Sequence, residues 1–317
     1  MRPSATFRAL GCSAVAAALA ACPTAAGAWG DQGHEIIAAL AKSYLKPAVL
    51  TKVNALLAAH QDNVPIAADM STRATWADKY RDQDRPTGPQ YLGTRNWHFV
   101  DTPLATPTSN AAVATALAQV CPHPTLNGPA SLGAPPDDCV VDKIKQFEAE
   151  LADKTVPQPE RVFALEFLLH FVGDVHQPLH ATDDNDRGGN CVLIHGGPNG
   201  QQINLHAYWD TRIIEILMNG ATPTDYANSL KAQITPGQKA AWETDDATAW
   251  AIESFKVGKA KAYKLNVAPL PSCANPNHGA SVIMLPANYE SDAAAAAKLQ
   301  LEKAGVRLAF ILNKALS

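Results

Sequence analysis

The sequence has no excess of positive charge. Its 26 lysines and arginines are outnumbered by 30 aspartates and glutamates, and the formal net charge is −4 at pH 7. Without residues 1–28, which carry two arginines and no acidic residue, the charge becomes −6. Such a chain lacks the broad basic surface with which many nucleic-acid-binding proteins neutralise phosphates. If it handles phosphates, the positive charge must be local, from metal ions or from a few arginines and lysines.

Long apolar runs are lacking after the N-terminus. Residues 1–28 combine a basic start, a short apolar run and small residues at 26–28, which is typical of a secretory signal peptide. The run is too short to span a bilayer, and no later segment is long enough. We therefore expect cleavage after Ala28 and a periplasmic or secreted protein. A competing interpretation is a lipoprotein signal, because residues 19–22 resemble a lipoprotein box that would leave Cys22 lipidated.

The sequence has no C-x-x-C pair and no Asn-x-Ser/Thr sequon. The first absence argues against zinc ligation by cysteine, and the second against N-glycosylation. Cleavage after Ala28 leaves four cysteines, and an even number in an exported chain indicates two disulfides. Three pairings are open. We favour Cys121–Cys139 and Cys191–Cys273, because the first closes one loop rich in proline and glycine.

Apolar residues recur at helical spacing through most of the chain. We expect helices at about residues 36–45, 47–60, 74–81, 111–119, 139–153, 159–177, 204–219, 223–232, 236–258 and 290–316. Residues 95–101 look extended, 182–203 read as a loop or hairpin, and both 102–138 and 264–290 read as irregular. There is no repeat and no linker. The prediction is one mostly α-helical domain over residues 29–317.

Two His-x-x-x-Asp pairs dominate the polar pattern. His170 precedes Asp174, and His206 precedes Asp210, by four residues. This spacing places both side chains on one face of a helix, where an imidazole nitrogen and a carboxylate oxygen make half of a zinc site. His180 follows the first pair closely. Together these residues indicate a site with more than one metal ion.

Further candidates lie among apolar residues. They are His34, Asp78 and His98. Polar groups in such surroundings need partners, and metal ions satisfy several at once. The alternative is a buried His–Asp hydrogen-bond network, which would explain one pair but not this many. His176 is about 240° around the helix from His170 and points away from the metal-binding face.

Five motifs follow one another along the chain: Trp29-Gly-x-x-Gly-His34, Trp76-Ala-Asp78-x-x-Arg81, Trp97-His98-Phe-x-Asp101, His170-Phe-x-Gly-Asp174-x-x-Gln-Pro-Leu-His180 and Asn204-Leu-His206-x-x-Trp-Asp210. In this order they resemble the S1/P1 nuclease family of secreted, zinc-dependent and mostly helical phosphodiesterases. The ending at residues 306–309 is similar too. Each motif alone is weakly specific, whereas the ordered set is highly specific.

The resemblance implies three zinc ions, with these ligands: Asp78, His98, His170 and Asp174 for the first; His34, a bridging Asp174, and the amino nitrogen and carbonyl oxygen of Trp29 for the second; His180, His206 and Asp210 for the third. A metal-binding α-amino group must be free, so Trp29 must begin the mature chain. A lipidated Cys22 would leave seven residues before it, which favours ordinary export.

The resemblance also implies a mechanism. A water bridging the two zinc ions that share Asp174 becomes a hydroxide that attacks phosphorus in line, and the third zinc neutralises the departing 3′-oxygen. Arg81 matches the family's transition-state arginine, whose planar fork suits phosphoryl oxygens. Asp101 matches an acid that orients the attacking water or Arg81.

The implied substrates are RNA and single-stranded DNA, cut to 5′-phosphates, and 3′-nucleotides. Phe99 matches an aromatic residue on which a nucleobase stacks, with core packing as its plain alternative. Asn190 could hydrogen-bond the base edge, although a simple turn is nearly as good an explanation. We expect a monomer without a membrane anchor.

Two other functions stay open. One is a zinc-dependent phospholipase C, which shares the three-zinc arrangement but ends its ligand set with a glutamate where this chain has Asp210. The other is a non-catalytic zinc-binding protein, which would not need Arg81 or Asp101.

Overall fold

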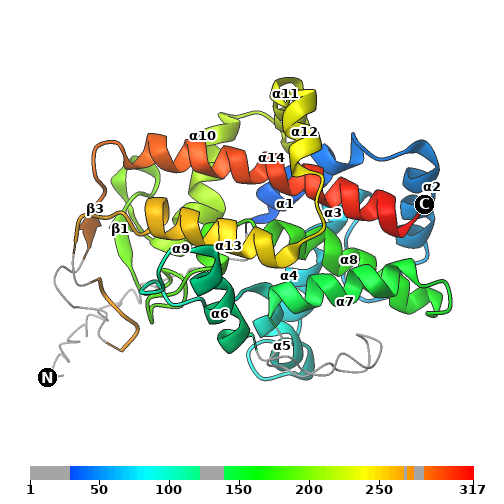
Figure 1. Cartoon of the computed structure of the whole chain (residues 1–317), viewed down its shortest axis with the longest axis horizontal. Helices are drawn as coiled ribbons and strands as arrows, with labels where there is room; N and C mark the ends of the chain where they lie inside the picture. The colour runs from blue at the N-terminus through cyan, green and yellow to red at the C-terminus, as the bar shows by residue number, and fades with distance from the viewer. Residues whose placement is uncertain (1–28, 122–138, 268–269, 275–281) are drawn as a thin grey trace, which may run out of the picture.

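The computed structural model describes residues 29–121, 139–267, 270–274 and 282–317. The fold is mostly helical, as predicted (Figure 1). The α-helices are α1 (Asp31–Lys42), α2 (Pro47–Ala58), α3 (Met70–Arg73), α4 (Trp76–Asp82), α5 (Pro89–Thr94), α6 (Asn110–Val120), α7 (Val140–Ala152), α8 (Gln158–Asp174), α9 (Leu205–Ala207), α10 (Ile213–Met218), α11 (Pro223–Gln233), α12 (Pro236–Trp242), α13 (Ala247–Val257) and α14 (Tyr289–Ala315). Short 3₁₀ helices are η1 (Arg95–His98), η3 (Pro178–His180) and η4 (Pro198–Gly200), and short π-helices are η5 (Tyr208–Arg212) and η6 (Gly258–Ala262).

Three short strands form the only sheet in the described part of the chain. They are β1 (Leu193–His195), β2 (Gln202–Asn204) and β3 (Ile283–Met284). β1 and β2 pair as an antiparallel hairpin, which is one of the two alternatives expected for residues 182–203, and its second strand ends one residue later, at Asn204. β3 adds a parallel strand from a region expected to be irregular. Within the described ranges, no helix combines the length and apolar character needed to span a bilayer. The predicted signal peptide lies outside the described residues.

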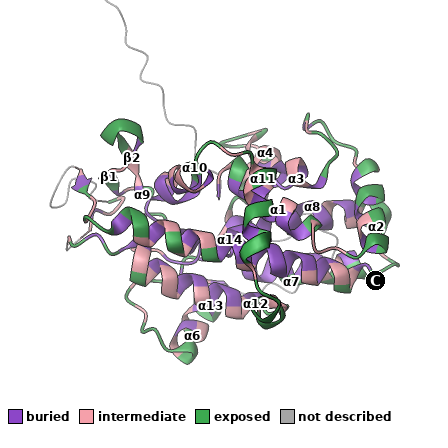
Figure 2. Cartoon of the chain, turned by 90° about the horizontal axis from the view of Figure 1, so that it is seen from above, coloured by how far each residue is buried: buried purple, intermediate pink, exposed green. Residues whose placement is uncertain are grey.

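Helix α8 lies at the centre of the core. Residues 164–174 are all buried, so this helix has no solvent-facing side over its last three turns. It packs against α7 most extensively, and also against α14, α2, α1 and α4. Figure 2 shows buried residues along α8, whereas the outlying α2 and α12 are largely exposed. Side chains on α8 are therefore held within a rigid, water-excluded interior.

An aromatic cluster on α8 fixes two neighbouring segments. The ring of Phe167 lies 5.1 Å from that of Trp76 and 5.4 Å from that of Trp97, and it stacks on Phe147 of α7 at 4.9 Å. Trp76 begins α4, and Trp97 lies in η1. Because these rings are buried, their packing determines where the following polar residues of α4 and η1 are placed.

The prediction of extended structure at residues 95–101 is wrong in its first half. Residues 95–98 form the 3₁₀ turn η1, which continues directly from α5, and Phe99 after it is extended, with φ −149° and ψ 173°. The turn places Trp97 against Phe147 and Phe167. Tertiary packing thus overrides the local pattern here.

Two predicted helices are also shorter than expected. The helix expected at 159–177 ends at Asp174, and Gln177 is extended because it precedes a proline. The helix expected at 236–258 is two helices, α12 and α13. Asp246 caps the second, accepting a hydrogen bond from the Ala249 N–H at 3.0 Å.

Both predicted disulfides are confirmed. Cys121 is bonded to Cys139, and Cys191 to Cys273. The second links residues 82 positions apart. Cys273 also donates its backbone N–H to the carbonyl oxygen of Asn185 at 3.1 Å. The loop that leads to the sheet is therefore attached to the C-terminal part of the chain at two points.

Candidate metal centre

A buried cluster of histidines and aspartates lies where α1, α4, η1 and α8 meet. Asp174 Oδ1 is 3.3 Å from His34 Nε2 and 3.4 Å from His170 Nε2, and its Oδ2 is 3.0 Å from His98 Nδ1. Asp78 Oδ1 is 3.6 Å from His170 Nε2 and 3.5 Å from His98 Nδ1. The structure therefore brings together all five side chains that the sequence assigned to the first two metal ions.

A second group lies beside the first. His180 Nε2 faces His206 Nε2 at 3.2 Å, and His206 Nε2 is 3.1 Å from Asp210 Oδ2. His206 and Asp210 share one face across the π-helical turn η5, a kind of distortion that is frequent at functional sites. Gln177 donates its side-chain N–H to the other oxygen of Asp210. These are the residues assigned to the third metal ion.

Backbone carbonyls orient the imidazole rings. Three histidines donate from Nδ1 to a carbonyl oxygen at 2.7 Å: His170 to Ala74, His180 to His98 and His206 to Gly188. Each bond places the proton on Nδ1 and leaves the Nε2 lone pair facing the centre, as metal-binding histidines require. At Gly188, φ is +59° and a Cβ would lie 2.4 Å from the Leu179 oxygen, so only glycine brings this carbonyl to His206.

Several inward-facing atoms have no hydrogen-bond partner among the described residues. They are His170 Nε2, Asp174 Oδ1 and Asp210 Oδ2. Buried polar atoms are normally satisfied, and a cluster of unsatisfied ones needs an explanation. The donors are imidazole nitrogens and carboxylate oxygens, the set that zinc accepts at catalytic sites.

The ligand atoms form three groups of metal-binding size. Within each group they lie within 4.8 Å of one another: His34 with Asp78 and His170; His98 with His170 and Asp174; His180 with His206 and Asp210. A fourth group, around Cys121 and Cys139, is excluded because its sulfurs form a disulfide. The ligand atoms of these three groups are therefore close enough together to bind metal ions.

Burial changes the protonation of these groups. It raises the pKa of Asp174 well above the usual range, and the nearby Asp78 carboxylate adds to the effect. Burial likewise raises the pKa of Asp210, against the opposing influence of His206. The pKa values of His98 and His180 are lowered well below the ordinary value, mainly by burial. The imidazoles of His98 and His180 are thus neutral and ready to bind a cation, whereas the carboxyl groups of Asp174 and Asp210 retain protons that a cation must displace.

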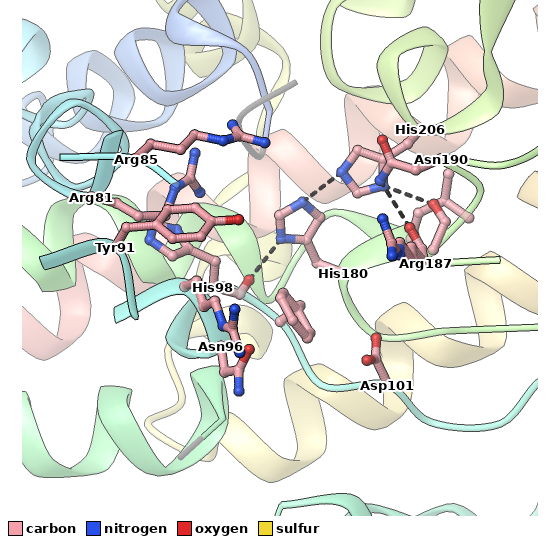
Figure 3. A pocket seen from close by; sticks show the side chains of 14 residues that line it. Arg81, Arg85, Tyr91, Asn96, His98, Asp101, His180, Arg187, Asn190 and His206 are labelled. Carbon is pink, nitrogen blue, oxygen red and sulfur yellow. Dashed lines mark hydrogen bonds between the residues drawn. The ribbon is translucent and has the colours of Figure 1, made fainter. Parts of the chain in front are cut away.

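A cavity of about 500 Å³ opens beside the second group (Figure 3). This volume lies within the ordinary range for small-molecule sites. Predicted residues that line it are Arg81, His98, Phe99, Asp101, His180, Asn190 and His206. The cavity therefore joins the metal ligands to the predicted substrate-binding residues.

Arg81 is fixed at the edge of the first group. Its Nη1 is 2.7 Å from Asp78 Oδ1, while Nε and Nη2 donate to the two oxygens of Asp82 at 2.8 and 3.0 Å. Asp101 is exposed, and Figure 3 shows it across His180 from Arg81. The expectation that Asp101 orients Arg81 has no support from this placement, and the alternative role, toward water, stays a prediction.

The remaining predicted residues lie at the cavity or beside it. Phe99 is half-buried, and Asn190 is exposed and donates from Nδ2 to the Arg187 carbonyl at 2.8 Å. Trp29 is fully buried, and the next residue, Gly30, donates its N–H to the Asp210 carbonyl oxygen at 2.8 Å. The beginning of the described chain is thus anchored at the metal centre.

A buried network that the sequence did not predict lies behind the centre. Glu166 Oε2 lies 2.8 Å from His60 Nδ1, and Oε1 lies 3.3 Å from Arg73 Nη1. His60 Nε2 is 2.6 Å from Asp62, whose other oxygen accepts from Trp76 Nε1 at 2.5 Å. Burial raises the pKa of Glu166 to about 8, with Arg73 opposing and Asp62 adding.

Two residues of this network lie close to the candidate metal ligands in the chain. Glu166 lies one turn before His170 on α8, and Arg73 directly precedes Ala74, whose carbonyl orients that histidine. The segment then runs on to Asp78. The sequence did contain an indication of this network, because Glu166 is the one charged residue in an apolar stretch of α8.

Comparisons with known proteins agree with this geometry. A family model described as S1/P1 Nuclease matches residues 29–317. The chain is similar to Nuclease P1 of Penicillium citrinum, with 26% identity over 309 residues, covering 90% of this chain and 97% of that protein. Endonuclease 3 of Arabidopsis thaliana is 29% identical over 225 residues, covering 68% of this chain and 65% of its own length. Nuclease S1 of Aspergillus oryzae is 28% identical over 213 residues, covering 66% and 63%. The chain thus spans just under two thirds of the Arabidopsis relative.

The raised carboxyl pKa values predict that zinc binding releases protons. Metal-free protein keeps Asp174 and Asp210 protonated to a higher pH than free aspartic acid, and zinc must displace those protons. Lowering the pH from about 8 to about 5 should therefore weaken the apparent zinc affinity. Calorimetric titration of EDTA-stripped protein with zinc, in two buffers of different ionisation enthalpy, measures both quantities. A constant affinity and a heat independent of the buffer would contradict the prediction.

Proposed function

The chain belongs to the S1/P1 nuclease family, and we propose that it is an exported, zinc-dependent nuclease that cuts RNA and single-stranded DNA to 5′-phosphates and dephosphorylates 3′-nucleotides. One observation carries this proposal. Buried imidazole and carboxylate atoms without hydrogen-bond partners in the described chain converge next to a cavity that an arginine and an aromatic ring also line. This arrangement suits a metal-assisted reaction of a phosphate ester.

We infer three zinc ions, held by the ligands that the sequence motifs imply. Asp174 is the proposed bridge, because its two oxygens face different histidines: Oδ1 faces His34 and His170, and Oδ2 faces His98. Trp29 would complete the second site with its backbone atoms. Its burial beside the Gly30–Asp210 hydrogen bond supports that role. Bound zinc would supply Lewis-acid chemistry, polarising phosphate oxygens and acidifying water.

Arg81 is the proposed phosphate clamp. A guanidinium carries five N–H donors, and three of those of Arg81 are used by Asp78 and Asp82. One hydrogen on each terminal nitrogen remains for phosphoryl oxygens. Since the two carboxylates already hold the planar group in one orientation, little side-chain entropy is lost when a phosphate binds.

Phe99, Asn190 and Asp101 are the proposed contacts to base and water. The half-buried ring of Phe99 offers a face on which any base can stack. A base reaches such a cavity only when it is splayed out of a stack, which favours single strands over duplexes. Asn190 would form a hydrogen bond with the edge of the base, and the exposed carboxylate of Asp101 would orient the attacking water.

The family match favours this function over phospholipase C and over a non-catalytic zinc protein. Export is supported by the two disulfides, which form and persist in oxidising compartments. We propose cleavage after Ala28 and action as a monomer without a membrane anchor.

A substrate panel tests the proposed activity. Purified protein should hydrolyse a single-stranded oligonucleotide and 3′-AMP, but not phosphatidylcholine, and EDTA should abolish both activities until zinc is restored. The measurements are release of 5′-phosphorylated products and of inorganic phosphate. Hydrolysis of phosphatidylcholine alone would assign the protein to the rival enzyme class, and activity that persists in EDTA would overturn the metal-dependent mechanism.

The bridging role of Asp174 predicts an unequal effect of two matched substitutions. Asp174→Asn should lower kcat for oligonucleotide cleavage more than Asp210→Asn, and by more than about 100-fold, since even residues that only support metal ligands can cost 10–100-fold. Initial rates and zinc content per chain are the measurements. Asp245→Asn, at an exposed ion pair with Lys314, is the control. A larger loss for Asp210→Asn would rule out Asp174 as the shared ligand.

A further inference from the structure

The cavity extends beyond the residues used so far. Arg85, Tyr91 and Arg95 also line it, and the proposed reaction gives them no role. Figure 3 shows Arg85 and Tyr91 on one side of His180, with Asn190 on the other side. The far side of the cavity therefore has its own set of polar and aromatic groups.

Tyr91 is an aromatic platform between two cations. The Arg85 guanidinium lies 5.3 Å from the centroid of its ring, and that of Arg95 lies 6.0 Å from it. The ring is half-buried, whereas both arginines are exposed. A guanidinium near an aromatic ring can stay stacked while it binds a phosphate, and a base can stack on the same surface.

The backbone holds Tyr91 in place. The carboxylate of Asp84 accepts from the backbone N–H groups of Gln90 and Tyr91 at 2.9 and 2.8 Å, which fixes the beginning of α5. Thr94 donates its hydroxyl to the Gln90 carbonyl at 2.8 Å one turn later. The platform is thus a preorganised feature of the fold.

The charge of the cavity differs from that of the chain. Four arginines line it, Arg81, Arg85, Arg95 and Arg187, although the chain carries a net charge of −4. Arg81 is paired with two carboxylates, but Arg95 and Arg187 have no ion pair with any described residue, and Arg85 is only within 3.7 Å of Asp82. This local positive charge is what an acidic protein needs in order to bind a polyanion.

We propose that Arg85, Tyr91 and Arg95 form a second nucleotide subsite, which binds the base and phosphate of the nucleotide that follows the scissile phosphate, away from Phe99. The inference rests on the proposed nuclease function. A polynucleotide occupies both sides of the cavity, whereas a 3′-mononucleotide has one base and occupies the Phe99 side. The subsite therefore favours single-stranded polymers over mononucleotides.

The test compares two substrates in the same zinc-loaded protein. The variants are Arg85→Gln with Arg95→Gln, and separately Tyr91→Leu; the substrates are a short oligothymidylate and 3′-AMP. The ratio of kcat/KM for the oligonucleotide to that for 3′-AMP should fall by about 10-fold in each variant, because a stacked base and its bound phosphate contribute on this scale. The salt dependence of oligonucleotide cleavage should also weaken in the double arginine variant, by roughly 0.7 in log–log slope for each phosphate that the variant no longer neutralises.

A control double variant removes the same charge elsewhere. Lys154→Gln with Lys264→Gln alters two exposed lysines that do not line this cavity, and the ratio should stay at the wild-type value. Exposed arginines tolerate glutamine, so the double arginine variant tests the subsite even if Tyr91→Leu fails to fold. An unchanged ratio in that variant, or an equal fall in the lysine control, would overturn the subsite. A wild-type protein that cleaves neither substrate would instead overturn the proposed function on which the subsite rests.

Discussion

The structure depends on the carboxylate of Asp174, which is buried between three imidazoles. One oxygen faces His34 and His170, the other faces His98, and Asp78 lies close to two of the same histidines. Burial and the neighbouring Asp78 carboxylate together raise the pKa of Asp174, so the ionisation of Asp174 is opposed unless a further cation is present. Bound metal ions would resolve that conflict. The fully buried end of α8, the aromatic cluster on it and the oriented imidazoles all support the positions of these few atoms.

α1 packs closely on α8 at this site. The ring of His34 stacks on that of His170 with centroids 3.7 Å apart. A Cβ at Gly173 would lie 2.7 Å from His34 Nδ1, so a larger residue there would push the histidine away. Behind α8, the Glu166 network holds the segment that leads to Asp78. The ligands are thus positioned by packing and by hydrogen bonds, which is how metal sites reach catalytic geometry.

Much of the fold and of the candidate metal centre can be predicted from the sequence, because most of the ligands lie in short sequence motifs. The two His-x-x-x-Asp spacings, the cysteine count and the helical periodicity are readable within short windows. The features that the sequence did not predict depend on interactions between residues far apart in the chain. The 3₁₀ turn at residues 95–98 is set by Trp97 packing on α7 and α8, and the His60–Glu166 pair joins residues 106 apart. The group of Arg85, Tyr91 and Arg95 could not be predicted from a short stretch of sequence, because its role depends on its lining the same cavity as His180.

Native mass spectrometry of the purified, mature protein tests the central claim most directly, because one spectrum reports both where the chain begins and how many zinc ions it holds. A chain that starts at Trp29 and carries three zinc ions, which are lost together with activity on chelation, is the predicted result. A mature chain with fewer than two zinc ions, or one that binds three while retaining residues before Trp29, would contradict the proposed metal centre.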